Sequence, residues 1–185
     1  MPSNFKLRQA SRVIISGGVI AYPTEAVFGL GCDPDCYPAV EQIFLLKRRN
    51  PAAGLILIAD CIERLAGWAA PTQEEHKNMS VASPAPITWV VTADPQAADW
   101  ITGGRPTIAV RITRHPVAAD LCRLSETPLV STSANRAGRA PARTALTVRK
   151  HFGRQIDLVI SGQTGDQLNP TEIREARTGA VLRSA

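Results

Sequence analysis

The chain has no apolar run approaching the roughly 20 residues that a membrane-spanning helix needs. Its amino-terminal segment lacks the long apolar block and the cleavage site of a signal peptide, so we expect it to form the first helix of a mature cytoplasmic protein. Internal repeats and low-complexity tracts are missing as well. A chain of 185 residues with these properties is predicted to be one domain over residues 1–185 that does not bind a membrane.

Cysteine and histidine are scarce and scattered. None of the four cysteines has CxxC spacing, and no histidine-rich segment accompanies Cys32 and Cys36, which could lie near each other. Free thiols in a reducing compartment are therefore favoured over a zinc site or a disulfide. The three histidines have no context that supports nucleophilic catalysis, and neither a Walker A sequence nor a GxGxxG motif occurs. A metal site built from protein ligands is not expected.

Positive charge is concentrated in the second half of the chain. Residues 1–104 contain 8 Lys/Arg and 10 Asp/Glu, a net charge of −2, whereas residues 105–185 contain 13 and 6, a net charge of +7. Most of the excess is arginine, whose planar fork matches phosphate oxygens. Phosphate or nucleic acid is the predicted partner, and a solvated basic surface is the alternative.

Predicted helices alternate with predicted strands. Helices are expected over 4–16, 38–47, 115–122 and 144–152. Strands are expected over 19–22, 54–59, 87–93, 107–112, 129–132 and 157–161, with two short ones near Glu172 and Val181. Asp60 with Glu63, and Thr72 with Glu75, have the spacing of helix caps. The alternation indicates an α/β fold, and the hairpin-like spacing in the middle and the tail indicates a mixed sheet.

The stretch VIAYPTEAVFGLGCD, residues 19–33, is the first candidate site. Thr24 and Glu25 follow a buried strand that Pro23 ends, where a polar pair is costly unless it has partners. Gly29 and Gly31 predict a turn in which the backbone runs close to another group. The pattern predicts a ligand site at the carboxyl end of a strand, or else a turn that merely connects.

Three further segments carry candidate binding groups. Lys47 and Arg49 end a predicted helix, where the helix dipole favours cations, but they could also clamp a triphosphate. The hydroxyls and amide of 131–135, followed by Gly138 and Arg139, suit phosphate or carboxylate binding, or else a capped turn. Arg111 near the end of an apolar strand needs a partner, either a substrate carboxylate or a protein carboxylate.

Four motifs in order resemble the YrdC/Sua5 family of threonylcarbamoyl-AMP synthases. They are YPTEAVFGLGCD, the pair Lys47-x-Arg49, AVRITRHP and STSANRAG, and the resemblance continues to the tail NPTEIREARTGAVLR. It implies a twisted, open, mixed α/β sheet with flanking helices and a basic concave groove, in the short bacterial form of the family. It also implies a nucleotidyltransferase reaction, in which L-threonine, bicarbonate and ATP give threonylcarbamoyl-adenylate and diphosphate.

The resemblance assigns roles to residues and partners. Mg²⁺ enters with ATP, no cofactor is tightly bound, and a tRNA threonylcarbamoyl-transferase complex uses the product for tRNAs that read codons beginning with A. The groove is a possible contact for tRNA or other RNA. Lys47 and Arg49 are implied to be catalytic. Those implied to bind nucleotide are Lys47, Arg49, Ser133, Asn135, Arg139 and Arg183, and those implied to bind threonine are Thr24, Arg111 and Thr171. Lys47, Arg49, Ser133 and Asn135 are expected to line one cavity.

Some residues depart from the family pattern. Ala53 stands where a lysine or asparagine is usual, and SPAPIT replaces WPGPxT. Loss of one charge-assisted contact would weaken ATP binding about 10- to 100-fold. The alternatives are a non-catalytic RNA-binding or ribosome-maturation factor and a carbamoyl-handling domain like those of hydrogenase-maturation proteins. No general base is obvious, and Glu25 is a candidate by its location alone.

Overall fold

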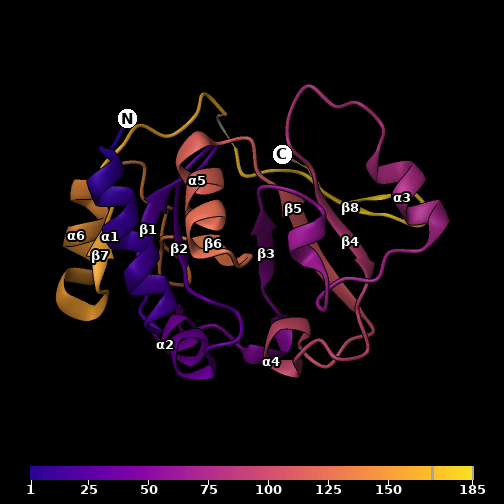
Figure 1. The fold of residues 1–185 in the computed structure, drawn as a ribbon, viewed down its shortest axis with the longest axis horizontal. Helices are drawn as coiled ribbons and strands as arrows, with labels where there is room; N and C mark the ends of the chain where they lie inside the picture. Colours follow the sequence, from indigo (N-terminus) through magenta and orange to yellow (C-terminus); the bar gives the residue numbers. More distant parts are fainter. Residues whose placement is uncertain (168, 185) are drawn as a thin grey trace.

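A mixed sheet of nine strands runs through the computed structural model, which describes residues 1–167 and 169–184 (Figure 1). Its order is β7-β1-β2-β6-β3-β5-β4-β8-β9, with parallel pairs β1–β7, β3–β5 and β4–β8 among antiparallel ones. The predicted mixed α/β fold is confirmed. The strands are β1 (Ile20–Pro23), β2 (Phe28–Gly31), β3 (Ile56–Ala59), β4 (Thr88–Thr92), β5 (Thr107–Ile112), β6 (Leu129–Ser133), β7 (Leu158–Val159), β8 (Ile173–Glu175) and β9 (Val181–Arg183).

Side-chain caps begin three of the described helices. The side chains of Ser3 and Thr144 cap α1 and α6, and Thr72 and Glu75 form the predicted capping box of α3. The helices are α1 (Asn4–Ile15), α2 (Tyr37–Lys47), α3 (Gln73–Met79), α4 (Asp99–Thr102), α5 (Pro116–Ser125) and α6 (Ala145–Phe152), with 3-10 turns at Pro51–Ala53, Glu63–Leu65 and Gly153–Gln155. Within the described ranges, no helix is long and apolar enough to cross a bilayer.

Two local predictions are wrong. Residues 29–31 are not a turn but belong to β2, which forms a hairpin with β1 and also pairs with β6. The close approach predicted for these glycines does occur, because the Tyr22 ring packs against them. Asp60 does not cap a helix with Glu63; its carboxylate pairs with Arg64 instead.

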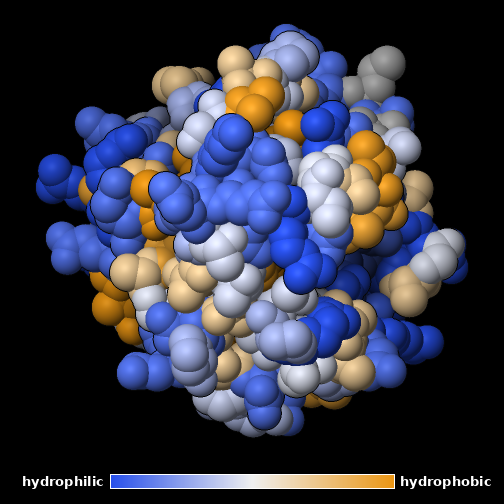
Figure 2. Space-filling model, turned by 90° about the vertical axis from the view of Figure 1, so that its right-hand side faces the viewer, coloured by the Kyte–Doolittle hydropathy of each residue, from blue (hydrophilic) through white to orange (hydrophobic). Residues whose placement is uncertain are grey.

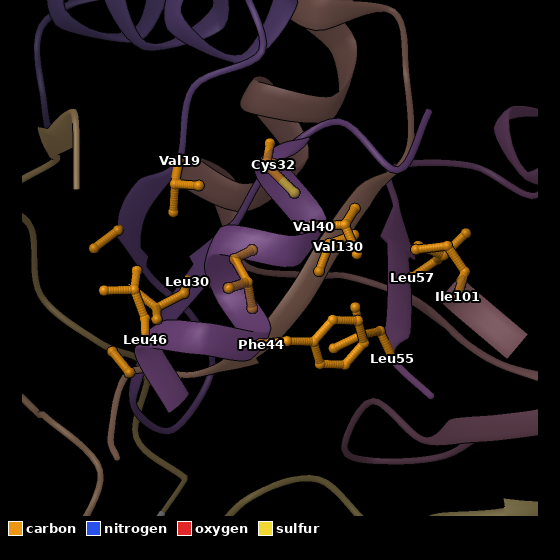
Figure 3. Packing of buried hydrophobic residues seen from close by; sticks show 14 of the residues in the cluster. Val19, Leu30, Cys32, Val40, Phe44, Leu46, Leu55, Leu57, Ile101 and Val130 are labelled. Atoms are coloured by element: carbon orange, nitrogen blue, oxygen red, sulfur yellow. The ribbon is translucent and has the colours of Figure 1, made fainter. Parts of the chain in front are cut away.

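One face of the sheet carries the larger hydrophobic core. Val40 and Phe44 of α2 lie near Leu55, Leu57 and Val130 in this core (Figure 3). Side chains of α4, α6 and the segment around Leu65 complete it. Because alternate residues of a strand point to opposite faces, this leaves the neighbouring side chains of the same strands for the other face.

The other face is covered by α1 and α5, which pack against each other (Figure 1). They bury Ile20, Tyr22, Ile58 and Leu129 in a second, smaller core. The register places Ala109 beside Ile56 on this same face, outside that buried core. The helix layer therefore covers only part of the face, and a cavity lies over the remainder.

The segment between β7 and β8 passes along one edge of the sheet, where it runs across the top of Figure 1. Its Gly165 donates a backbone hydrogen bond to the carbonyl of Thr24 at 3.0 Å. A side chain on Gly165 would come within 2.6 Å of the Glu25 carbonyl, so this close crossing requires glycine. The crossing brings Thr171 to the cavity.

The end of the molecule that carries α3, β4 and β8 has a mixed surface (Figure 2). Hydrophobic side chains occur there in separate groups among hydrophilic ones.

We predict that Gly31→Ala lowers the free energy of unfolding by about 1–3 kcal/mol, because a Cβ atom there would lie 2.5 Å from the Val130 carbonyl oxygen. Gly29→Ala is the matched control, since its Cβ atom would meet the Thr24 side chain at 3.2 Å and needs a smaller adjustment. Urea denaturation of both variants measures the difference. Equal losses would contradict the assignment of close packing to Gly31.

Candidate active site

A cavity of about 470 Å³ lies on the sheet face that α1 and α5 leave uncovered. This volume is in the range of small-molecule sites. Its floor comes from neighbouring strands and carries the small residues Gly29, Ala109 and Ser131. The site thus lies across the sheet face and is not confined to the carboxyl end of a strand, where the sequence pattern had placed it.

Arg111 lies at one end of this cavity and is 7% exposed. Its Nη1 donates to Thr171 Oγ1 at 2.8 Å and to Thr88 Oγ1 at 3.5 Å, while Nη2 is 3.7 Å from Glu25 Oε2. Among the described residues, its Nε has no hydrogen-bond partner. The sequence left two partners open for Arg111, a protein carboxylate and a substrate carboxylate. The ion pair with Glu25 supports the first, and the position in the cavity lining is consistent with the second.

Glu25 is held as a carboxylate. Its Oε1 accepts hydrogen bonds from Thr113 Oγ1 at 2.6 Å and from the Arg114 backbone at 3.1 Å. Burial alone would raise the pKa of Glu25, but the charge of Arg111 and these hydrogen bonds outweigh burial and lower the pKa below its ordinary value. A carboxylate with a lowered pKa is a poor proton acceptor, which argues against Glu25 as a general base.

Three more arginines line the cavity: Arg49, Arg105 and Arg183. Desolvation and the nearby charges of Arg105 and Arg183 lower the pKa of Arg49, and desolvation and the charge of Arg111 lower the pKa of Arg183. Among the described residues that line the cavity, Glu25 is the one acid, and it is already paired with Arg111. The cavity therefore has an excess of positive charge that suits a polyanion.

Lys47 is not among the described residues that line the cavity, and its Nζ contacts the Ser133 backbone instead. Its Nζ donates to the carbonyls of Ser133 and Asn135 and to Asn135 Oδ1, so all three ammonium donors are used. The side chain is 6% exposed, and burial followed by the charge of Arg49 lowers its pKa to about 8. In this geometry Lys47 joins the end of β6 at Ser133 to the loop that follows it.

Asn135 and Arg139 also belong to this loop and not to the described lining of the cavity. Asn135 Oδ1 accepts from Ser133 Oγ at 2.6 Å, and its Nδ2 donates to the Arg139 carbonyl at 2.7 Å. The Arg139 residue itself is exposed. Both residues therefore shape the loop that follows Ser133, the last residue of β6, which lines the cavity.

The structure brings six of the nine predicted site residues together around the cavity. They are Thr24, Arg49, Arg111, Ser133, Thr171 and Arg183. Lys47 and Asn135, expected to line the same cavity, are not among its described lining residues and instead form hydrogen bonds with Ser133, so their nucleotide-binding roles stay predictions.

Sequence reasoning missed Arg105, which follows the predicted glycine turn and lines the cavity. It also missed Thr88, which contacts both Arg111 and Thr171. The sequence signal for Arg105 was its position directly after Gly103 and Gly104 and before the strand that carries Arg111. For Thr88 no sequence signal stood out.

In the described part of the chain, no group of three or more His, Cys, Asp or Glu side chains is arranged so that it could hold a metal ion. Cys32 and Cys122 are buried, and all four cysteines are free thiols. The one carboxylate of the described lining is engaged by Arg111, so the residues present do not form a protein site for Mg²⁺.

Comparison with known proteins points to one family. The Sua5/YciO/YrdC family model, described as "Telomere recombination", matches residues 12–185. Relatives named threonylcarbamoyl-AMP synthase from Nitrosococcus oceani and Halorhodospira halophila are each 49% identical over 97% of this chain. The matches cover 98% and 94% of those relatives.

Solved structures agree with the sequence comparison. P. abyssi Sua5 complexed with L-threonine is 32% identical, with a TM-score of 0.86 over 94% of this chain and 51% of that chain. E. coli YciO, 23% identical, has a TM-score of 0.84 over 99% of this chain and 92% of that chain, and supports the fold alone.

We predict that Lys47→Ala lowers the free energy of unfolding by about 1–3 kcal/mol, because it leaves the partly buried carbonyls of Ser133 and Asn135 without their donor. Arg49→Ala should cost less than about 1 kcal/mol, since the residue is exposed and binds only carbonyls of a nearby turn. Thermal and urea unfolding compare the two variants. An equal loss of unfolding free energy in both variants would contradict the structural role given to Lys47 alone.

Glu25→Gln should reduce stability at pH 7 by about 3 kcal/mol, because it leaves the buried charge of Arg111 without its partner. The folded-state pKa of Glu25 is lowered, so its stabilisation is complete above the ordinary value of 4.5 and disappears as the pH falls through the folded-state pKa. The difference between wild type and variant in urea should therefore shrink in acid. A difference that does not depend on pH would refute this role.

Proposed function

Because this chain belongs to the Sua5/YciO/YrdC family, we propose that it is a threonylcarbamoyl-AMP synthase, a nucleotidyltransferase that uses ATP. The match to this chain spans nearly the whole length of the relatives that have this name. The observation that carries the proposal is the convergence of four arginines, from distant segments, around one cavity.

The proposed reaction has two steps. The amine of L-threonine adds to bicarbonate with loss of water and gives N-carboxythreonine. A carboxylate oxygen of this carbamate then attacks the α-phosphorus of ATP, the bond to the β-phosphate breaks, and diphosphate leaves. The protein contributes position and charge neutralisation and forms no covalent intermediate.

The threonine end is assigned to Arg111. Its Nη2 has a long ion pair with Glu25 at 3.7 Å and can bind a substrate carboxylate as well. Thr171 fixes the guanidinium group through Nη1, and Thr24 lines the same cavity. Glu25 acts through Arg111 as a positioning residue.

The nucleotide end is assigned to Arg49, Arg183 and Ser133, which line the cavity. The two guanidinium groups neutralise phosphate charge that grows as diphosphate leaves, which is the basis of the catalytic role of Arg49. Lys47 and Asn135 position Ser133 through the hydrogen bonds of its loop. Arg139, exposed beside that loop, is a proposed contact for the outer part of the nucleotide.

The remaining partners follow from the reaction. Mg²⁺ would enter as the counterion of ATP, since the described lining has no free carboxylate to bind it. The product would pass to a tRNA threonylcarbamoyl-transferase complex, which modifies tRNAs that read codons beginning with A. Because tRNA modification needs access to tRNA, the proposed location is the cytoplasm. Direct contact with tRNA or other RNA remains part of the proposal. A non-catalytic RNA-binding role is not favoured, because the matched relatives are named as synthases.

Purified protein supplied with ATP, L-threonine and bicarbonate should release diphosphate, and omission of either threonine or bicarbonate should abolish the release. A coupled diphosphate assay and detection of the adenylate by mass spectrometry measure the two products. L-Serine in place of threonine controls for unspecific ATP hydrolysis. Diphosphate release that needs neither threonine nor bicarbonate would contradict the proposed reaction.

A further inference from the structure

Arg49 and Arg105 are held on the same short turn. Arg49 donates to the Gly54 carbonyl through Nη2 at 3.0 Å and through Nε at 3.2 Å. Arg105 donates to the Ala52 and Ala53 carbonyls, each at 3.0 Å. Two cations that are distant in the chain therefore share one rim of backbone carbonyls at the edge of the cavity.

Glycine makes this meeting possible. Gly103 has a φ of 69°, and a Cβ atom there would lie 2.6 Å from the Ala52 carbonyl oxygen. Gly54 has a φ of 61°, and a Cβ atom there would collide with the guanidinium group of Arg105. Both turns thus need glycine, because each has a positive φ and leaves no room for a Cβ atom. The conformation of these two turns therefore holds Arg105 at the rim.

Neither cation is neutralised by the protein. Among residues 1–167 and 169–184, Arg49 and Arg105 form no ion pair with a carboxylate. The neighbouring charge of Arg105 contributes to lowering the pKa of Arg49, after desolvation. Two like charges held together without an acid form a site for a ligand with at least two negative charges.

The arginines follow an order along the cavity. Arg105 precedes β5 and Arg111 lies near its end, and six residues of extended strand span about 20 Å. Arg183 is related to both groups, since its Nη2 donates to the carbonyl of Thr171, whose hydroxyl binds Arg111, and its charge contributes to lowering the pKa of Arg49. The rim of Arg49 and Arg105 therefore lies toward the start of β5, away from Arg111 near the end of that strand.

We propose that Arg105 is a further polyphosphate-binding residue, and that Arg105 and Arg49 together hold the diphosphate end of ATP, the part that leaves. The assignment rests on the proposed function, because that function places threonine at Arg111 and the reacting α-phosphate between the two ends. Inorganic diphosphate, which carries only the leaving part, should bind at the same rim.

The test compares three ligands by isothermal titration calorimetry. Arg105→Ala should weaken binding of inorganic diphosphate and of ATP about 10- to 100-fold, the effect of losing a charge-assisted contact, and change binding of AMP less than about 2-fold. Arg154→Ala, which removes an exposed arginine outside the cavity, should change none of the three. Arg105→Lys keeps the charge without the planar fork and should lie between wild type and Arg105→Ala.

Unchanged diphosphate binding in Arg105→Ala would overturn the proposal, and so would an equal loss for diphosphate and AMP. If Arg105→Ala fails to fold by its thermal melting curve, Arg105→Gln and Arg105→Lys decide by the same ligand comparison. The wild-type turnover assay separates the two proposals. Diphosphate binding that depends on Arg105, in a protein without threonine-dependent turnover, would keep the anion site and reject the synthase function.

Discussion

One buried guanidinium group organises the cavity. Arg111 is 7% exposed, and burying an unpaired cation would cost several kcal/mol. The cost is offset by the Glu25 carboxylate and by the hydroxyls of Thr88 and Thr171. These partners come from the turn after β1, from β4 and from the segment before β8, so one charge on β5 fixes three distant segments around it. The walls at this end of the cavity thus depend on an electrostatic requirement that apolar packing alone would not impose.

The sheet can carry a cavity because its two faces are used differently. The α2 side holds the larger core, and α1 with α5 seals only the part of the other face that contains Ile20, Tyr22, Ile58 and Leu129. Beyond the part that α1 and α5 cover, the strands present small residues such as Gly29, Ala109 and Ser131, which leave room for the cavity. Stability therefore comes mostly from one face, while the uncovered part of the other face is free to bind a ligand.

The sequence predicted features that are local or that the family resemblance supplied. Apolar periodicity and caps located most helices and strands, and the motifs pointed to Arg49, Arg111, Ser133 and Arg183, all of which line the cavity. β2 was missed because glycine usually favours turns, whereas here the Tyr22 ring fills the space above Gly29 and Gly31. The depth of Lys47 and the meeting of Arg105 with Arg49 depend on long-range packing, which spacing along the chain does not encode.

The way these arginines are held explains how their charge stays available. Elsewhere in the protein Arg64, Arg123 and Arg174 pair with carboxylates, which cancel their charge. In the cavity, Arg49, Arg105 and Arg183 donate instead to backbone carbonyls. A carbonyl is neutral overall, so it fixes the direction of a guanidinium group without removing the net charge. The free protein bears the resulting repulsion, and a bound polyanion would relieve it, so the same arrangement that strains the free cavity favours its ligand.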